Sequence, residues 1–174
     1  MNRLWALAIL PALVWAAPSK AAEPANVLGV FQNWKAFSTG SGDSMTCFAM
    51  SEPRAQQPKT PKRANVFLMV SDWPGRKVTA EPEIAMGTTF KAGAAVTLTV
   101  GGDRFDFFSR NDGKTGTGWL KNLPDGPKLV DALSGGISAV ARGTSAKNQK
   151  LVDTYSLAGF PDAMAKVHAA CKMS

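Results

Sequence analysis

Histidine and cysteine are scarce in this sequence of 174 residues, which contains one His and two Cys. Neither Cys belongs to a CxxC pair or to a His–Cys cluster, the spacings that hold structural zinc. The glycines are numerous, but they form neither a GxGxxG motif after a strand nor a GxxxxGKS/T motif, the patterns that cradle phosphates. The sequence therefore predicts neither a metal site nor a bound cofactor.

Long apolar runs are equally few, and the prominent one lies at the start of the chain. A short basic stretch precedes an almost unbroken apolar run over residues 4–17, and Ser19 and Ala21 place small residues at the −3 and −1 positions of a cleavage site. This arrangement is typical of a secretory signal peptide, and the run is too short to span a bilayer comfortably. We expect removal of residues 1–21, with cleavage near Ala21/Ala22, and an exported periplasmic or secreted chain without a transmembrane segment.

One domain, residues 22–174, remains after this removal. It loses Arg3 and Lys20 with the signal peptide, so the formal net charge falls from +7 to +5. A chain of this length suits a single domain with a real hydrophobic core, for which nine Phe supply material. The composition excludes an integral membrane protein and a multidomain assembly, and it argues against a cytosolic enzyme.

Alternation of apolar and polar residues predicts that most of the domain is β-structure. The clearest pattern is a hairpin over residues 95–109, in which Val96, Leu98 and Val100 alternate with threonines before a Gly-Gly-Asp turn. Further strands are predicted at residues 27–37, 45–50, 66–70, 83–90, 137–142 and 151–157. Turns are predicted at residues 38–43, 73–75, 91–93, 111–113 and 116–118. Three prolines within residues 51–65 predict an exposed extended loop there.

Two helices are predicted beside these strands. A short helix near residues 127–134 follows a Pro-Asp-Gly-Pro turn and ends at two glycines. A second helix near residues 161–172 begins at Pro161, and its apolar residues recur in steps that place Cys171 on the buried face. The expected fold class is therefore mostly β (α+β): an antiparallel β-sandwich-like domain with two short helices.

Cys47 and Cys171 both belong to the exported chain. An oxidising compartment favours their pairing, and two cysteines allow one connectivity. In the loop-entropy description, closing a loop of more than about 100 residues stabilises the fold by roughly 4–5 kcal/mol. A reactive or metal-binding thiol is the alternative. We expect a disulfide that ties the strand at residues 45–50 to the C-terminal helix.

Candidate catalytic groups are few. His168 lies three residues before Cys171, so a Cys–His pair is conceivable, but a disulfide-bonded Cys171 cannot be a nucleophile. Paired carboxylates are the other candidates for acid–base chemistry. They are Asp103 with Asp106, Glu81 with Glu83 beside a proline in a predicted loop, and Asp112 in an Asn-Asp-Gly turn. Because Asp in such turns commonly bonds its own backbone, we expect no catalytic residues.

Two alternatives to a non-enzymatic binding protein stay open. The first is a periplasmic hydrolase that uses carboxylates of the 103–112 region. Buried carboxylates in a cleft would favour this enzyme, whereas exposed turn carboxylates would favour the binding protein. The second is an envelope-homeostasis factor with a protein partner, which should present an exposed apolar patch.

Positive charge concentrates in two predicted loops. One loop carries Arg54, Lys59, Lys62 and Arg63, and the other strand-to-strand connection carries Arg142, Lys147 and Lys150. If the fold brings them together, they form a basic rim for an anionic lipid, lipopolysaccharide, glycan or acidic protein; otherwise they are solvated loops. Nucleic acid is not an expected partner, because the chain is exported and the aromatic residues do not interleave with this charge.

Characteristic segments follow one another along nearly the whole mature chain. They are FQNWKAF at 31–37, TCFA at 46–49, FDFF at 105–108 followed by Asp112-Gly113 and Trp119, RGTSA at 142–146, DTYSL at 153–157 with Gly159-Phe160, and the terminal Cys171. Together these segments resemble the invasion-associated locus B family of small exported proteins of Gram-negative bacteria. The ending from residue 153 onward is the most specific part of the resemblance.

The resemblance implies a protein without established enzymatic activity, cofactor or catalytic residues, in a family named after host-cell invasion. Some members carry an additional Cys shortly after the Trp that matches Trp34. Residues 35–37 contain none here, which agrees with a single Cys47–Cys171 bridge. We therefore expect an exported, non-enzymatic protein that acts by binding a host or envelope component: a protein, a glycan or an anionic molecule.

Overall fold

The structure is a computed structural model that describes residues 24–173. The predicted signal peptide, residues 1–21, lies outside these residues. The strands are β1 (Asn26–Phe31), β2 (Trp34–Thr39), β3 (Thr46–Ser51), β4 (Ala55–Gln57), β5 (Val66–Trp73), β6 (Val78–Met86), β7 (Val96–Val100), β8 (Asp103–Asn111), β9 (Gly116–Leu120), β10 (Ser138–Thr144) and β11 (Lys150–Ser156). The helices are α1 (Gly126–Gly135) and α2 (Phe160–Cys171), with 3-10 turns η1 (Gly42–Ser44), η2 (Pro74–Arg76) and η3 (Leu123–Asp125).

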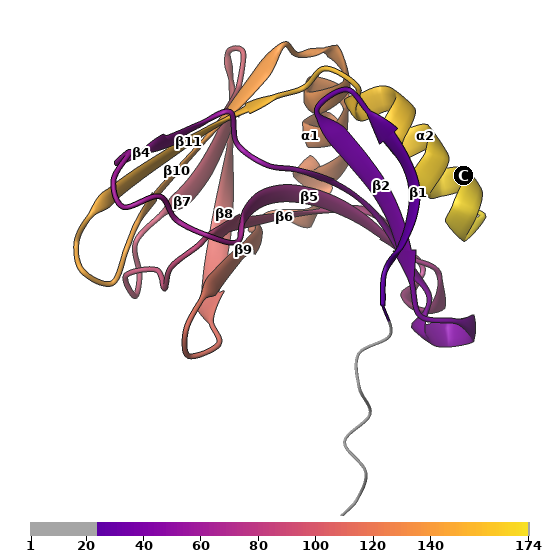
Figure 1. Cartoon of the computed structure of the whole chain (residues 1–174), viewed down its shortest axis with the longest axis horizontal. Coiled ribbons are helices and arrows are strands. Elements are labelled where there is room, and N and C mark those ends of the chain that lie inside the picture. Colours follow the sequence, from indigo (N-terminus) through magenta and orange to yellow (C-terminus); the bar gives the residue numbers. More distant parts are fainter. Residues whose placement is uncertain (1–23, 174) are drawn as a thin grey trace, which may run out of the picture.

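All these strands belong to one antiparallel sheet with the order β1-β2-β3-β5-β6-β9-β8-β7-β10-β11-β4. Figure 1 shows that the sheet is strongly curved. Helix α2 packs across β1, β2, β3 and β5, and α1 packs against β6. The mostly β class with a middle and a C-terminal helix is confirmed. The expected sandwich-like arrangement takes the form of a single open sheet that curves around its core.

The β7–β8 hairpin is confirmed, and it shows how the sequence builds this core. Val96 pairs with Phe107 and Leu98 pairs with Phe105 across the ladder, and all four side chains are buried. Alternate residues of a strand face opposite sides of the sheet. The threonines and charged residues between them therefore face the other side.

The segment at residues 27–37 forms two strands instead of one. Phe31 pairs with Trp34, so Gln32 and Asn33 make a two-residue turn between β1 and β2. Gln32 has φ 52°, a left-handed conformation that is uncommon outside glycine, asparagine and aspartate. The turn carries no glycine, so its residue types do not signal a chain reversal.

Two further predictions were wrong. Residues 51–65 contain β4, because the prolines at 53 and 58 lie outside the three residues that pair with β11 at the sheet edge. Residues 116–118 form part of β9 instead of a turn. Gly116 lies so close to Phe90 that a side chain at this position would collide with it, so this glycine serves close packing within a strand.

Strand β6 begins and ends earlier than the predicted strand at residues 83–90. It covers Val78–Met86, and Phe90 forms only an isolated bridge with Ser145. Both Glu81 and Glu83 therefore lie on a strand and not in a loop.

The C-terminal helix is fastened to the sheet by its apolar face. Phe160 packs edge-on against Trp34 at 4.8 Å between ring centroids, and Val167 is fully buried. A disulfide joins Cys171 to Cys47 on β3, with 5.9 Å between the Cα atoms, so the predicted pairing is confirmed. The early strands and the end of the chain therefore form one packed unit.

Candidate functional site

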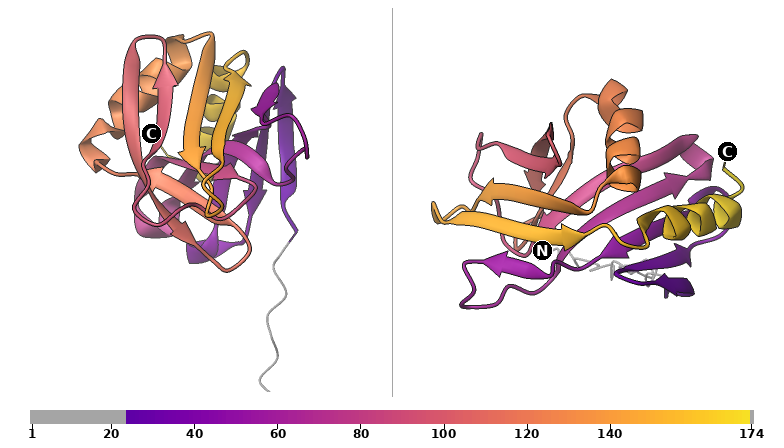
Figure 2. Two further views of the ribbon diagram at one scale, coloured as in Figure 1. Left: turned by 90° about the vertical axis from the view of Figure 1, so that its left-hand side faces the viewer. Right: turned by 90° about the horizontal axis from the view of Figure 1, so that it is seen from above.

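Pairing of β4 with β11 decides where the two basic loops lie. Gln57 faces Val152 in this ladder, so the loop that leaves β4 lies at the same end of the sheet as the β10–β11 turn (Figures 1 and 2). The exposed side chains of this end, here called the basic end, are Lys59, Lys62, Lys147 and Lys150. The fold thus brings the two predicted loops to one region of the surface.

Lys91 also belongs to the basic end, and the sequence analysis missed it. Its backbone N–H donates to the carbonyl of Thr144 at 2.9 Å, and its ammonium donates to Oδ1 of Asn148 at 2.7 Å. Asn148 lies 57 positions further along the chain. No local pattern in the sequence connects two positions so far apart.

The arginines of the predicted rim lie elsewhere. Arg54 is exposed at the other end of β4, where its N–H donates to the Thr154 carbonyl at 2.8 Å. Arg142 is exposed in the middle of β10, opposite Val152. Neither of them lies in the loops of the basic end.

Arg63 does not form part of a basic surface, contrary to the expectation. Its side chain is 8% exposed and ion-paired with the fully buried Asp153. Its Nη1 also donates to the Met86 carbonyl at 2.6 Å. Burial raises the pKa of Asp153, while the hydrogen bond and charge of Arg63 act in the opposite direction. Arg63 therefore fixes the β4–β5 loop to the sheet and is not available to a ligand.

The carboxylates of the 103–112 region are surface groups. Asp103 accepts from Lys128 at 2.7 Å, and Asp106 is paired with Arg104 at 3.3 Å, all four with substantially exposed side chains. Asp112 accepts hydrogen bonds from Thr115, which lower its pKa. This is the exposed arrangement that favours a binding protein over a hydrolase.

His168 does not form a pair with a thiol, because Cys171 is disulfide-bonded. Its Nδ1 instead lies 2.6 Å from Oδ2 of the fully buried Asp72. Oδ1 of Asp72 accepts from the Ala80 N–H at 2.8 Å. Both oxygens of the buried carboxylate are thus engaged, and the pair connects α2 to β5 and the start of β6.

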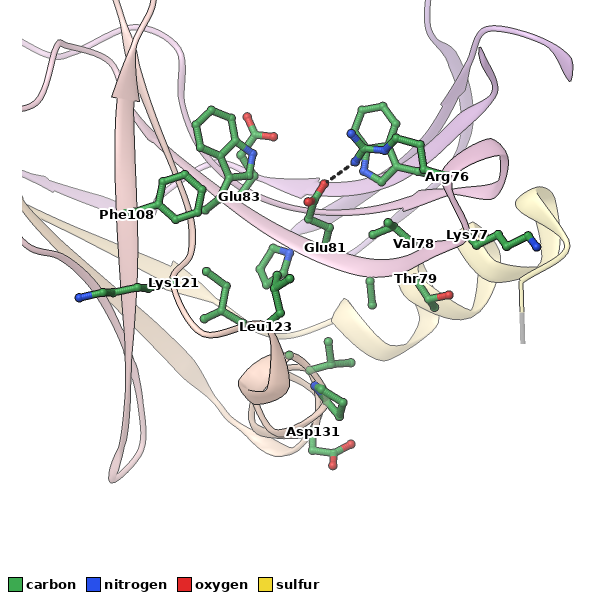
Figure 3. Close-up of a pocket in the computed structure, with 18 of the residues that line it drawn as sticks. Arg76, Lys77, Val78, Thr79, Glu81, Glu83, Phe108, Lys121, Leu123 and Asp131 are labelled. Atoms are coloured by element: carbon green, nitrogen blue, oxygen red, sulfur yellow. Dashed lines mark hydrogen bonds and ion pairs between the residues drawn. The ribbon is translucent and has the colours of Figure 1, made fainter. Parts of the chain in front are cut away.

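A groove of about 1120 Å³ runs along the first half of β6 (Figure 3). It exists because β9 pairs with β6 only from Glu83 to Ala85, which leaves residues 78–82 without a neighbouring strand on that side. Residues of η2, β8, β9, η3 and α1 complete its walls, and His168 contributes from α2. The sequence analysis did not predict this groove.

Two aromatic residues in the groove each lie beside a glutamate of β6. In the first arrangement, here called the Trp73 site, the Arg76 guanidinium lies 4.3 Å from the Trp73 ring centroid and 3.0 Å from Glu81. In the second, here called the Trp119 site, Trp119 faces Glu83 in the β6–β9 ladder, and Phe108 lies 5.8 Å from the Trp119 ring. Burial and the nearby charge of Glu81 raise the pKa of Glu83.

The face of the sheet opposite the helices changes character along its length. Over β7 and β10 it carries polar residues, the half-buried Thr99 and the exposed Arg142 among them, as expected for a solvated face. Over β1, β2, β3, β5 and β9 it carries exposed or half-buried apolar side chains, here called the uncovered face: Val27, Val30, Phe37, Phe48, Met50, Phe67, Met69 and Trp119. Phe37 and Phe48 stack on each other at 5.1 Å, outside the main core.

The family model described as "Invasion associated locus B (IalB) protein" matches residues 34–168. The chain belongs to the IalB family. The resemblance found in the sequence is thus confirmed. No curated protein matches the chain.

A solved structure resembles this IalB-family protein: the invasion associated protein B from Bartonella henselae. The two are 16% identical, and the match covers 83% of this chain and 97% of the other, with a TM-score of 0.60. At this identity the likeness concerns the fold alone. It supports the mostly antiparallel sheet with two helices.

Residues 24–173 of this IalB-family protein contain no group of three or more His, Cys, Asp or Glu side chains placed to hold a metal ion. The helices of this described part are also too short or too polar to cross a membrane. The groups with a distinct chemistry are therefore the basic end, the two aromatic–carboxylate sites and the uncovered face.

Proposed function

We propose that this IalB-family protein is an exported, non-enzymatic protein that binds an anionic component of the bacterial envelope or of a host surface through its basic end. The observation that carries the proposal is the placement of Lys59 and Lys62 at the same end of the sheet as Lys147 and Lys150. The apolar start of the sequence and the Cys47–Cys171 disulfide support export, because disulfides persist in oxidising compartments.

The electrostatics of the basic end favour an anionic ligand. Within residues 24–173, none of its lysines forms an ion pair with a carboxylate, and Lys91 adds a fifth positive charge. Unpaired lysines near an anionic surface contribute about 1 kcal/mol each, and salt screens this attraction over roughly 8 Å. Several lysines acting together are thus enough for weak, salt-sensitive binding.

The test compares two charge-matched variants of the mature, disulfide-bonded protein on vesicles. The probe is phosphatidylglycerol in phosphatidylcholine, with pure phosphatidylcholine as the blank. The variant K59A/K62A/K147A should lose at least tenfold in affinity, whereas K35A/K121A/K166A, which removes the same charge from exposed lysines elsewhere, should lose much less. Equal loss in both variants, or binding that does not respond to salt, would contradict the proposal.

A second candidate function is favoured by the uncovered face. An envelope-homeostasis factor with a protein partner requires an exposed apolar patch. The uncovered face combines the exposed Val27 and Val30 with the half-buried Phe37, Phe48 and Met69. A photo-crosslinking residue at position 69 or at position 147 in intact cells separates the two functions. Protein crosslinks confined to position 69 would support the second function, and crosslinks to anionic envelope material confined to position 147 would support the first.

A further inference from the structure

The two aromatic–carboxylate sites of the groove have similar side chains, but only the Trp73 site also holds a cation from residues 24–173 of the protein itself. In the Trp73 site, the guanidinium of Arg76 lies over the indole and pairs with Glu81. This combination of a cation, an aromatic face and a carboxylate is a known mode of recognition for organic cations. The protein therefore demonstrates with its own side chain which group fits such a site.

The Trp119 site has the aromatic face and the carboxylate, but no cation is paired with the carboxylate. Among residues 24–173, no Lys or Arg forms an ion pair with Glu83, which lies opposite Trp119 in the β6–β9 ladder. Phe108 supplies a second ring on the exposed side of Trp119. Glu83 is thus a half-buried side chain without a counter-ion, and its ionised form is disfavoured until a cation binds beside it.

The cations that line the groove do not supply this counter-ion. Arg76 is engaged with Glu81, and Arg110 lies over Phe108 at 5.7 Å. Figure 3 shows the side chains of Lys77 and Lys121 directed away from the centre of the groove.

We propose that the Trp119 site binds a basic side chain, foremost an arginine, of a protein partner. The guanidinium would stack on Trp119 beside Phe108 and pair with Glu83, as Arg76 does with Trp73 and Glu81. Arginine fits better than lysine because its planar group both stacks on aromatic rings and pairs with a carboxylate through two donors. The ligand charge is opposite to that expected at the basic end, so this site goes beyond the proposed function.

The experiment follows the indole N–H resonances of Trp73 and Trp119 by NMR in the mature, disulfide-bonded protein. The probes are N-acetyl-arginine methylamide and its neutral isostere N-acetyl-citrulline methylamide. We expect the arginine probe to produce saturable shifts at Trp119, with at least tenfold weaker binding of the citrulline probe. E83Q should lower the affinity for the arginine probe at least tenfold. Higher salt concentration should lower the affinity of the wild-type protein for the same probe.

Two more variants sharpen the test. D106N removes an exposed carboxylate that is paired with Arg104, and it should leave the affinity unchanged. R76Q removes the guanidinium that lies over Trp73. A second molecule of the arginine probe should then bind at the Trp73 site and shift the Trp73 indole resonance. This second event is expected only if the two sites recognise the same group.

The outcomes that overturn the proposal are equally specific. Binding of the citrulline probe as strong as that of the arginine probe would show recognition of the amide backbone instead of a cation. Unchanged binding in an E83Q protein that gives a dispersed, native-like spectrum would exclude Glu83 as the counter-ion. If spermidine binds more tightly than N-acetyl-arginine methylamide, the ligand of the Trp119 site is a small polyamine and not a side chain of a protein.

Discussion

His168 on the last helix contacts Asp72 on β5 through Nδ1 and Oδ2, which are 2.6 Å apart. Asp72 faces Cys47 in the β3–β5 ladder, and Cys47 is bonded to Cys171, one helical turn after His168. The helix is therefore connected to two neighbouring strands by two side-chain links, one covalent and one polar. This relationship gives the first prediction.

Replacing His168 by Ala should destabilise the protein, because Oδ2 of the buried Asp72 loses its partner. His168 itself is 31% exposed, so water can replace part of the interaction. We expect a loss of about 1–3 kcal/mol in the free energy of unfolding, measured by urea titration. K166A, an exposed change on the same helix, should stay within about 0.5 kcal/mol of the wild type. A similarly small effect for H168A would show that the contact contributes little.

The Arg63–Asp153 ion pair should be more important for stability. Both side chains are almost completely buried, so R63M leaves an uncompensated carboxylate and should cost about 3–5 kcal/mol. The double variant R63M/D153L removes both charges and should recover part of this loss. K62A, next to Arg63 but exposed, is the control. If R63M unfolds at the same urea concentration as K62A, the pair does not hold the β4–β5 loop.

Glu83 should make stability depend on pH. Burial and the charge of Glu81 raise its pKa in the folded state above the ordinary value of 4.5. Its protonated form is favoured by folding, so its contribution is complete below pH 4.5 and is lost as the pH rises through the raised pKa. E83Q should therefore be more stable than the wild type at neutral pH. Its unfolding free energy should also fall less between about pH 4 and pH 7.

This prediction is tested by urea titrations at several pH values. D106N is the matched control, because it makes the same kind of change at an exposed carboxylate outside the groove. Parallel profiles for E83Q and the wild type would contradict the prediction.

The disulfide should raise the free energy of unfolding, because it closes a long loop whose ends are 124 positions apart. C47S/C171S should lose about 4–5 kcal/mol in the loop-entropy description. Mass mapping of periplasmic material without reductant should find Cys47 and Cys171 in one linked peptide pair. Two free thiols in that material would contradict the prediction that the disulfide stabilises the exported protein.

Short-range patterns in the sequence were sufficient for several elements. The β7–β8 hairpin follows from strict alternation and a Gly-Gly-Asp turn, and α2 follows from Pro161 and its apolar spacing. Each of these signals acts between residues that are close in sequence, where backbone geometry decides the outcome. The basic loops were recognised for the same reason, although Arg63 was placed with them wrongly.

The sequence by itself determined the scarcity of catalytic and metal-ligating groups, the family and the single possible disulfide. Only the tertiary structure decided that Arg63 is buried, that Lys91 joins the basic end and that the two glutamates of β6 face Trp73 and Trp119. Asp153 lies 90 positions from Arg63, and Trp119 comes to Glu83 through a ladder between β6 and β9. Such contacts depend on which strands become neighbours in the sheet, and that choice is made by packing of the whole chain.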